Sequence, residues 1–457
     1  MAAPALAACK GEPPRETAAP PATPTAVVKQ STAPPTYWNR VASILETHCT
    51  SCHAAGGIGP MSLTSFADAN TNAGPIAHEM ESRHMPPWLP KTRACMQLKH
   101  ERSVPQADID AVIAWAKAGA PEGDRADYRA PEKKGTYARL PDQPDRVAIP
   151  DLAYAPKRGK VDGKSDDYHC FVLDPHLEKK ERIVGLRIAP GAPAIVHHVL
   201  LFEVRASALD KIKERDDAEP GPGYTCFGGI GVHPTVRAGN LQKGELVDFD
   251  AQMIVGWAPG GGGTDVAGAP TALPKDTAIH LAPGSKLVMQ VHYSLDNLQQ
   301  GMTDRTRVDM WMAKDDESKK QGVWVPLLKY DFHVPPGVGP DDSRARASNE
   351  VALPLPLEIL GVAPHMHLRG RTIKVEAQRD DELSQCLLDV PQWDFRHQEA
   401  YWLNAGVRAS KASVSCSWDN RPSAQPVANG KRKPAKELHW GEGTDDEMCL
   451  AFLYATL

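Results

Sequence analysis

The sequence predicts a multidomain protein in which a small all-α domain precedes two all-β sandwich domains. Apolar residues recur at helical spacing in residues 37–46 and 106–118. Beyond residue 160 the chain consists of short β-prone runs between Gly, Pro and Asp turns. Two proline-rich stretches, residues 10–36 and 126–158, flank the helical part. We therefore expect two connectors and three folded domains.

Composition limits the classes of function. The 457 residues have room for about three domains at roughly 150 residues each. A net charge of −5 argues against nucleic-acid binding, which calls for a basic face. No apolar run reaches the roughly 18 residues that cross a bilayer. The 41 prolines and 36 glycines suit a turn-rich β architecture.

The N-terminal stretch, residues 1–36, has the features of a truncated lipoprotein signal with a tether. Leu6-Ala7-Ala8-Cys9 resembles a bacterial lipobox, in which the cysteine is lipidated and becomes the first mature residue. Few residues precede Cys9, too few for a complete signal. The match is therefore either a trimmed signal or an accident of an alanine-rich stretch. The Pro/Ala/Thr-rich composition of residues 10–36 is typical of a tether and favours a lipid anchor at Cys9.

A short cysteine motif, Cys49-Thr50-Ser51-Cys52-His53, directly follows the first predicted helix. In a CxxCH motif both cysteines form thioether bonds to a haem c, and the histidine then ligates the iron. The alternatives are a zinc site or a thioredoxin-like redox motif. Zinc would need a second ligand pair nearby, and the redox motif would lie in a βαβ context. Neither is present, so the motif favours one covalent haem with His53 as its proximal ligand.

The helices on either side of this motif indicate its domain. Residues 106–118 (QADIDAVIAWAKA) form a predicted amphipathic helix that stops at Gly119. Helix, CxxCH, loop and closing helix is the plan of a small class I cytochrome c, which we place at residues 37–125. Met85, in the stiff sequence HMPPW, is the favoured sixth ligand because a methionine raises the potential. Other candidates for that position are Met61, Met80 and His84.

Two further domains are expected after a linker at residues 126–160. The β-prone runs have the spacing of β-sandwich domains, and roughly 300 residues accommodate two of them. A charged stretch, AKDDESKKQG, interrupts the strands and places the boundary between residues 161–316 and 317–457. The predicted runs are residues 183–188, 195–204, 286–293, 307–312, 357–363, 372–377, 414–418 and 448–454.

The six remaining cysteines indicate an oxidising compartment. They are widely dispersed and contain no further CxxC pair, whereas a zinc site would want closely spaced pairs. Structural disulfides are therefore favoured. Because haem c is attached outside the cytoplasm in bacteria, a periplasmic or cell-surface location is expected. These cysteines are Cys95, Cys170, Cys226, Cys386, Cys416 and Cys449.

One histidine pair lies at the end of a predicted strand. His365 and His367 are two residues apart, so their side chains share one face of the strand and are able to reach one ion. Met448 would add a soft thioether, and two imidazoles with a thioether favour copper. An open position on such a copper is where dioxygen would bind.

A second histidine set is less regular. His197 and His198 are neighbours in AIVHHVLLFEV, and on a regular strand their side chains point to opposite faces. Joint ligation therefore requires a bulge or a strand end. His292, in LVMQVHYS, would complete a three-histidine copper site suited to one-electron storage. Taken alone, a histidine pair in a β domain is more often buried structure than a ligand.

The segments around these residues resemble the copper type II, ascorbate-dependent monooxygenases, the family of peptidylglycine α-hydroxylating monooxygenase and dopamine β-hydroxylase. The resemblance covers roughly residues 160–457, and its pieces follow the family's order. They are Asp167-Tyr168-His169-Cys170, HHVLLF, MQVHY, the HxH of PHMHLRG, and Asp446-Glu447-Met448-Cys449.

The resemblance implies two jelly-roll-like sandwich domains that face each other across a solvent-filled cleft. It assigns His197, His198 and His292 to an electron-storing copper. It assigns the catalytic copper, which binds oxygen and substrate, to His365, His367 and Met448. It also implies a Cys416–Cys449 disulfide and leaves the partners of the other four cysteines open.

Two departures from the peptidylglycine enzymes affect the expected substrate. Ala363 stands where those enzymes have an arginine that helps to hold the substrate carboxylate, and Phe452 stands where they have a tyrosine. A glycine-extended peptide is thus disfavoured and a less polar molecule is favoured. No partner for the amine of a phenethylamine is evident either.

These observations together predict an extracytoplasmic copper monooxygenase. Dioxygen, two electrons and two protons would convert a C–H bond of a small organic substrate to C–OH and release water. The haem would pass electrons from an external donor, either a redox protein or an ascorbate-like reductant, to the coppers. Asp446 and Glu447 are expected to have surface or supporting roles. The alternative is a non-enzymatic electron-transfer or copper-binding lipoprotein on the same scaffold.

Overall fold

The computed structural model describes most of the chain after residue 32, and the proposed anchor Cys9 and most of the tether lie outside it. Pro35–Leu457 forms one compact unit. None of the helices in the described part is both long and apolar enough to span a bilayer. The described residues are 33–50, 52–54, 59, 61–91, 94–99, 101–131, 140–157, 166–227, 229–232, 236–238, 247–257, 271–295, 298–314, 319–380, 382–395, 397–428, 431–441, 443 and 445–457.

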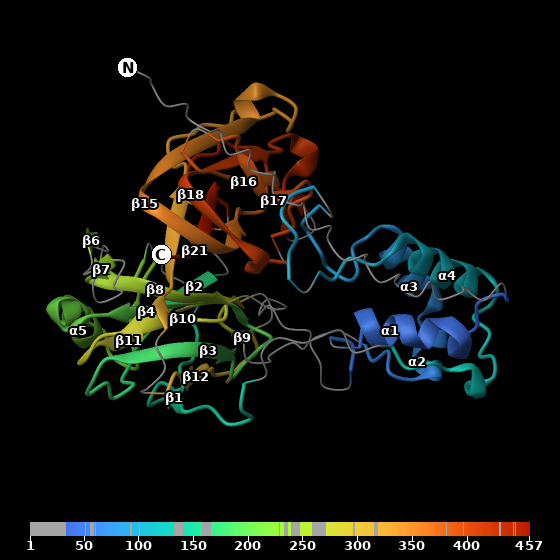
Figure 1. The fold of residues 1–457 in the computed structure, drawn as a ribbon, viewed down its shortest axis with the longest axis horizontal. Helices are drawn as coiled ribbons and strands as arrows, with labels where there is room; N and C mark the ends of the chain where they lie inside the picture. Colours follow the sequence, from blue (N-terminus) through green and yellow to red (C-terminus); the bar gives the residue numbers. More distant parts are fainter. Residues whose placement is uncertain are drawn as a thin grey trace, which may run out of the picture. The chain divides into compact units, whose positions relative to one another are not determined.

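The first folded part is helical, and we call it the helical region (Figure 1). The chain enters it through a capping box, in which the Thr36 hydroxyl accepts from the backbone N–H of Asn39 and the Asn39 side chain accepts in return. Its last α-helix ends at the C-cap residue Ala118, and the following Gly119 adopts a φ of +84° that favours glycine. The elements are η1 (Tyr37–Val41), α1 (Ala42–His48), α2 (Phe66–Thr71), α3 (Ala73–Glu81), α4 (Gln106–Lys117) and η2 (Arg125–Asp127).

The helical region has its own apolar core. Trp115 and Val112 of α4 are fully buried, and they pack with Leu45 of α1 and Met80 of α3. The Trp115 indole N–H donates to the carbonyl of Pro121 at 3.0 Å, which satisfies its polar atom. The helices predicted at residues 37–46 and 106–118 are confirmed.

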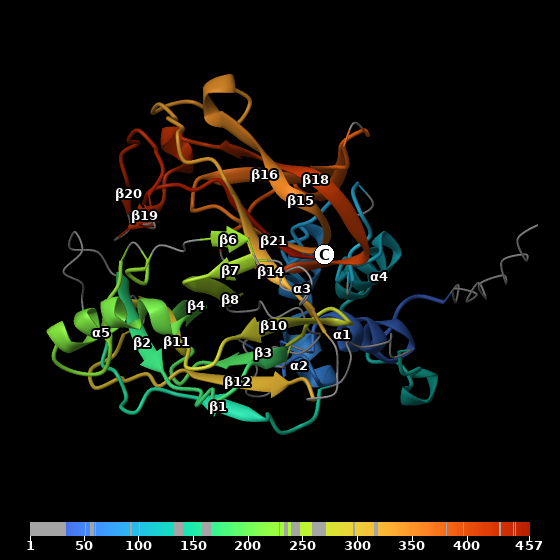
Figure 2. The same ribbon diagram turned by 60° about the vertical axis from the view of Figure 1, so that its left-hand side comes forward.

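The first β region, β1 to β13, is a sandwich of two sheets (Figures 1 and 2). Apolar residues of both sheets interdigitate between them, for example Ile183 and Met310 from one sheet with Met289 and Leu201 from the other. One sheet has the order β1 (Arg146–Ala148), β12 (Arg307–Met312), β3 (Glu181–Ala189), β10 (Thr277–Leu281) and β13 (Lys320–Gln321), with β9 (Thr271–Ala272) also on β3. The other has the order β5 (Tyr224–Thr225), β2 (Asp166–Leu173), β11 (Lys286–Ser294), β4 (Val196–Val204) and β8 (Ala251–Trp257).

A helix and a small ribbon accompany these sheets. Helix α5 (Leu209–Ala218) buries Ile212 against an apolar cluster that includes Val204 and Val288. The strands β6 (Val236–Ala238) and β7 (Val247–Phe249) pair with each other.

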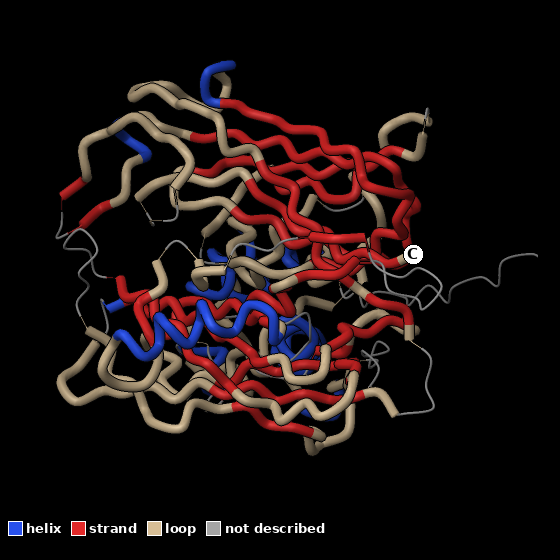
Figure 3. Tube along the Cα trace, turned by 90° about the vertical axis from the view of Figure 1, so that its left-hand side faces the viewer, coloured by secondary structure: helices blue, strands red, loops and turns tan. Residues whose placement is uncertain are grey.

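The second β region, β14 to β21, is built on one sheet dominated by two long strands (Figures 2 and 3). Strand β15 is 20 residues long and β18 is 18, and their pairing shifts register twice. Such irregularities bend a sheet and let it enclose a core. The sheet order is β14 (Val323–Leu328), β21 (Leu450–Thr456), β15 (Arg346–His365), β18 (Tyr401–Trp418), β16 (Gly370–Gln378) and β17 (Gln385–Val390). The short strands β19 (Val427–Ala428) and β20 (Lys431–Arg432) form a separate pair.

The predicted linker at residues 126–160 is partly structured. Its β1 pairs with β12 of the first sheet, and the Trp311 indole donates to the carbonyl of Pro141 at 2.8 Å. Tyr154 is buried in the core of the sandwich. Parts of this stretch therefore pack onto the first β region, and short strands and single buried aromatics are hard to recognise in a proline-rich sequence.

Three disulfides confirm the prediction made for the six dispersed cysteines. Cys416–Cys449 is the pair implied by the family resemblance, and Cys170–Cys226 lies within the first β region. Cys95–Cys386 was not foreseen, since it joins the helical part of the sequence to β17. Disulfides of this kind are typical of an oxidising, extracytoplasmic compartment.

Candidate metal centres

The first candidate centre consists of His197, His198 and His292, and a strand irregularity brings them together. His292 on β11 lies opposite His198 on β4, but the next residue, Tyr293, lies opposite Val196. His197 is thus the extra residue of a bulge, which turns its side chain toward the face that carries His198. The requirement stated from the sequence, a bulge or strand end, is confirmed.

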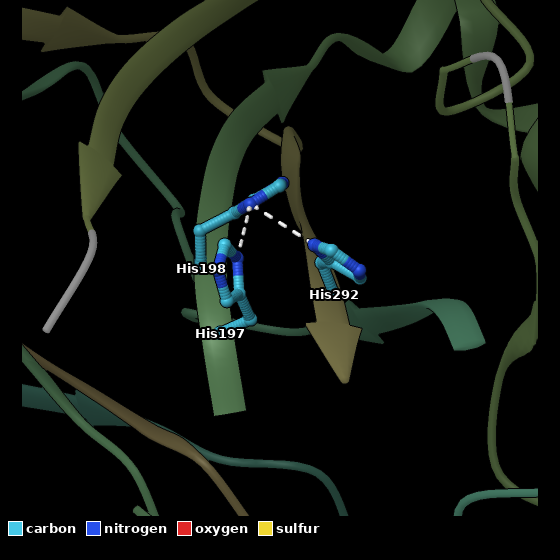
Figure 4. Close-up of side chains that lie close together, drawn as sticks. All are labelled: His197, His198 and His292. Atoms are coloured by element: carbon cyan, nitrogen blue, oxygen red, sulfur yellow. Dashed lines mark hydrogen bonds between the residues drawn. The ribbon is translucent and has the colours of Figure 1, made fainter. Parts of the chain in front are cut away.

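The three imidazoles converge through their Nδ1 atoms (Figure 4). The Nδ1 atom of His198 lies 3.2 Å from that of His292 and 3.4 Å from that of His197. One ligand atom from each ring lies within 4.8 Å of the others. Two imidazole nitrogens that share one first-row ion at about 2.0–2.1 Å stand roughly 3.3–3.6 Å apart. The cluster, which we call the triad, therefore fits one metal ion.

Neighbouring groups orient the triad. The far nitrogen of His292, Nε2, lies 3.1 Å from the carboxylate of Asp166, so it carries the proton and leaves Nδ1 as the ligand atom. The Tyr168 ring stacks on His292 with centroids 4.2 Å apart. Burial lowers the pKa of His197 to about 4, and it holds that of His198 well below its usual range. Both rings are neutral at pH 7 and able to ligate a metal.

The second candidate centre contains the His365–His367 pair at the end of β15. Their ring centroids are 5.1 Å apart. The Gln398 amide donates to the carbonyl of Phe395 at 2.8 Å, so its oxygen faces the Nδ1 of His365 at 2.6 Å. The Nδ1 of His367 likewise donates to the carbonyl of Asp446 at 3.1 Å. Each ring therefore keeps its Nε2 lone pair for a ligand.

Burial also keeps this pair neutral. It lowers the pKa of His365, and it lowers that of His367 to about 3. Met448 is 8% exposed and lines the same cavity as the two histidines. We call His365, His367 and Met448 the thioether cluster. Two neutral imidazoles and a thioether suit copper in particular.

A buried carboxylate next to Met448 hydrogen-bonds the segment that carries His367. Glu447 is fully buried beside Met448, and it accepts hydrogen bonds from the backbone N–H groups of His367 and Arg369 at 3.0 and 2.6 Å. The Trp418 indole N–H donates to it at 3.0 Å. Burial raises the pKa of Glu447 to about 7, although these donors oppose the shift. The Asp446 carboxylate instead lies 3.2 Å from the ammonium of Lys436 near the surface.

Both clusters border one cavity of about 350 Å³ between the two β regions. His198 of the triad and all three residues of the thioether cluster line it. Its other walls are mainly apolar and aromatic. These apolar wall residues include Leu186, Ile188, Phe202, Met253, Trp257, Trp324, Ala363, Trp402, Trp440 and Phe452.

One side chain contacts both clusters. The Phe395 ring stacks on His197 with centroids 5.2 Å apart, and it meets His367 edge-on at 5.7 Å. Phe395 also lines the cavity. The two clusters are therefore close neighbours here, separated by one aromatic ring.

The charged residues in the described part of the cavity wall, Arg187 and Glu399, already form ion pairs. Among the described lining residues, Arg187 forms an ion pair with the fully buried Asp309 at 2.5 Å. Glu399 forms an ion pair with Arg102 at 2.5 Å. Ala363 and Phe452, which depart from the peptidylglycine enzymes, lie directly opposite each other on β15 and β21. That part of the wall is therefore apolar.

The CxxCH motif lies at the end of α1 in the helical region. The Nδ1 atom of His53 faces the carbonyl of Met61 at 3.1 Å, so Nε2 is the nitrogen left for an iron. A Cβ at Gly59 would meet the His53 ring at 2.5 Å, so glycine allows this close packing. The three disulfides use six other cysteines, and Cys49 is a buried thiol. These residues fit a covalent haem.

The choice of sixth ligand stays a prediction. Met85 is half-buried, whereas Met80 is almost completely buried in the helical core. The His84 ring is exposed and lies 3.5 Å from the Glu79 carboxylate.

Sequence reasoning missed several residues around the centres. Gln398 and Phe395 lie in a loop without a recognisable motif, so no signal pointed to them. The Asp166 carboxylate stands one residue before the recognised Asp167-Tyr168-His169-Cys170 segment. Glu447 was expected only at the surface or in support, and the structure buries it completely.

Comparison with known proteins gives distant relatives. DBH-like monooxygenase protein 1 of Homo sapiens is 22% identical over 366 residues, which cover 75% of this chain and 53% of the relative. The protein of that name from Gallus gallus is 21% identical, with 70% and 46% covered. The chain thus spans about half the length of the curated relatives it matches. No family model matches the chain.

The likeness of this chain to solved structures is weak. An allantoicase structure covers 56% of this chain and 76% of its own, with 10% identity and a TM-score of 0.17. A capsid structure of the virus PBCV-1 reaches a TM-score of 0.21 with 6% identity, and it covers 71% of this chain and 95% of its own.

Proposed function

We propose that this protein is a copper-dependent monooxygenase that hydroxylates a C–H bond of a small, largely apolar substrate with dioxygen. The observation that carries the proposal is that two histidine clusters, one with a thioether, border one apolar cavity. The distant similarity to DBH-like monooxygenase proteins supports it. The three disulfides support a site of action outside the cytoplasm.

The residues of the triad and the thioether cluster would hold one copper each. Copper bound there would supply the one-electron chemistry that dioxygen activation requires. The triad presents three Nδ1 atoms, and Asp166 fixes the tautomer of His292. The thioether cluster presents two Nε2 atoms, with Gln398 and the Asp446 carbonyl holding the opposite nitrogens.

The cavity would bind the substrate and exclude water. Its aromatic walls would orient the substrate by shape, because the described charged residues are already paired. A free carboxylate or ammonium would meet no unpaired counter-ion in the described wall. We therefore propose a neutral substrate.

The helical region would feed electrons to these centres. Cys49 and Cys52 would attach a haem c, His53 would ligate its iron, and Met85 is the proposed sixth ligand. Such a haem accepts electrons one at a time from an external donor.

The test is oxygen incorporation by the copper-loaded protein. The purified full chain, with haem and copper verified, is incubated with a reductant, labelled dioxygen and a panel of neutral apolar compounds. We expect substrate-stimulated oxygen uptake and a product that carries one labelled oxygen atom. Met448→Ala should abolish the product and leave the haem spectrum intact. Normal turnover in that variant would contradict the copper assignment.

The second candidate function is a non-enzymatic electron-transfer or copper-binding protein on the same scaffold. The closeness of the two clusters across Phe395 suits rapid electron exchange and would serve either function. Oxygen uptake that yields only peroxide, without product from any compound, would favour this second function.

A further inference from the structure

A loop of the helical region is built into the second β region. We call the described residues 86–91, 94–99 and 101–103, between α3 and α4, the strap. Its Leu98 pairs with Leu403 at the start of β18, and the Lys99 N–H donates to the carbonyl of Trp402 at 2.7 Å. The Asn404 N–H donates back to the carbonyl of Gln97 at 2.8 Å. The strap thus extends the sheet at β18 as a short added strand.

Covalent and apolar contacts hold the strap in place. Cys95 forms its disulfide with Cys386 of β17, and the Met96 N–H donates to the carbonyl of Cys386 at 3.1 Å. Trp88, Leu89 and Leu98 pack against the core of the second β region. This attachment is independent of the chain connection at residues 126–160.

The strap also makes a buried polar and aromatic contact. Trp88 meets the buried ring of Tyr401 edge-on, with centroids 5.5 Å apart. The Arg102 guanidinium lies 5.6 Å from the centroid of Trp88 and forms the ion pair with Glu399. This partly buried ion pair favours one geometry, because breaking it leaves the Glu399 charge without its partner.

The contacted segment leads directly to the thioether cluster. Glu399 and Tyr401 flank Ala400, and the residue before Glu399 is Gln398, whose amide oxygen faces His365 at 2.6 Å. Gln398 and Glu399 both line the cavity. At the other end, Trp88 follows the proposed iron ligand Met85 by three residues. Trp88 therefore contacts Tyr401, and the chain leads from Tyr401 through Glu399 to Gln398, the partner of His365.

We propose that the strap is the electron entry route and that it delivers electrons to the thioether cluster first, with Trp88 and Tyr401 as the packed aromatic step. This inference rests on the proposed function. In the step, a haem held by Cys49, Cys52 and His53 would give up one electron, and a copper held by the thioether cluster would accept it. No bond forms and no proton moves. A small one-electron reductant such as ascorbate then restores the ferrous haem. The triad receives its electron afterwards, across Phe395.

The experiment is a flash-reduction study of the full-length, copper-loaded, oxidised protein without oxygen. A photogenerated one-electron reductant reduces the haem, and the decay of the ferrous absorbance band gives the rate of internal electron transfer. Freeze-quenched paramagnetic resonance then shows which cupric signal disappears first. In the unaltered protein we expect the signal of the thioether cluster to be lost first. Prior loss of the triad signal would overturn the proposal.

Matched variants test the residues of the route. We expect Trp88→Leu and Tyr401→Leu to slow haem re-oxidation severalfold and Tyr401→Phe to restore the rate. Trp38→Leu, which removes a tryptophan elsewhere in the helical region, should leave the rate unchanged. Equal rates in Trp88→Leu, Tyr401→Leu and the unaltered protein would overturn the route. Because the resonance measurement needs no substitution, a variant that fails to fold does not block the test.

The failure of this inference is distinguishable from failure of the proposed function. Haem and copper are measured in the same unaltered sample before the flash. The absence of covalent haem or of bound copper would overturn the proposed function and the route with it. The presence of both, with electrons reaching the triad first, would overturn the route alone.

Discussion

In three histidines of the two clusters, the ring nitrogen that points away from the cluster is held by a neighbouring group. Asp166 holds His292, Gln398 holds His365, and the carbonyl of Asp446 holds His367. Such partners fix the tautomer and the ring orientation of a ligand. The HH, HxH and DEMC segments pointed to the residues of the two clusters. Their partners were not predictable, because a single Gln or Asp in a loop has no distinctive spacing.

The first prediction concerns Glu447. Three N–H donors point at its carboxylate, and the amide nitrogen of a glutamine would turn a fourth donor toward them. We expect Glu447→Gln to lower the free energy of unfolding by about 2–3 kcal/mol. It should also weaken copper binding at the thioether cluster, measured by competition with a copper chelator.

The neighbouring Asp446→Asn is the matched control for Glu447. The Asp446 carboxylate lies near the surface beside Lys436, so we expect a change of less than about 1 kcal/mol. Equal effects of the two substitutions would contradict the positioning role of Glu447.

The second prediction is the pH dependence of the metal-free protein. Burial lowers the pKa of His197 to about 4 and of His367 to about 3, so the unfolded chain binds protons that the folded chain does not. The free energy of unfolding should therefore fall as the pH decreases from 6.5 toward 4. The total loss from each group is roughly 1.4 kcal/mol for every unit by which its pKa is lowered.

Glu447 has the opposite effect on the pH dependence of stability. Its pKa is raised to about 7, so its contribution is present below pH 4.5 and is lost as the pH rises through 7. His367→Gln should flatten the acid limb of the profile, measured by denaturant unfolding at several pH values. An unchanged acid limb in that variant would contradict the buried, neutral state of His367.

At the scale of elements, strand ends and a bulge position the two clusters. The bulge of β4 turns His197 beside His198; His365 ends β15, His367 follows two residues later, and both line the cavity. All eight β-prone runs predicted from the sequence lie in strands or overlap them. The sequence did not reveal β2 or β10, because strands that are buried on both faces lack a clear alternation. The strap was unpredictable, since its pairing depends on a partner about 300 residues away.

The third prediction concerns the disulfide that anchors the Met448 segment. Cys416 and Cys449 are 33 residues apart in sequence, so removing the bond should cost about 3–4 kcal/mol of stability. The double variant Cys416→Ala/Cys449→Ala should also lose copper more readily from the thioether cluster. Unfolding curves and chelator competition measure both effects.

Cys170→Ala/Cys226→Ala is its matched control. That bond lies in the first β region, and its cysteines are 56 residues apart in sequence. Its removal should cost comparable stability and leave copper binding at the thioether cluster unchanged. A similar loss of copper from that cluster in both double variants would show that general destabilisation explains the result.

For the whole molecule, both clusters border the one cavity between the β regions. The expected facing sandwich domains are consistent with the mostly β structure, and the first region is a two-sheet sandwich. The cavity wall was only partly predictable. Ala363 and Phe452 were recognised as departures from a known pattern, whereas Trp257, Trp324 and Trp440 come from separate strands and loops.

The fourth prediction tests the apolar character of that cavity. Metal-free protein should bind propylbenzene more tightly than 3-phenylpropanoate, because burying an unpaired carboxylate is costly. Quenching of the fluorescence of the lining tryptophans reports both. Ala363→Arg should reverse the preference, whereas an arginine at Leu383, which is 95% exposed, should not. Tighter binding of the carboxylate by the unaltered protein would contradict a neutral substrate.

The existence of two separate copper centres is decided by the copper content of the purified full chain after saturation and dialysis, measured by elemental mass spectrometry. We expect two copper ions per chain in the unaltered protein. We expect one in a variant without the triad histidines, and one in a variant without His365, His367 and Met448. A single copper in the unaltered protein, or a content that neither variant changes, would contradict the two-centre assignment.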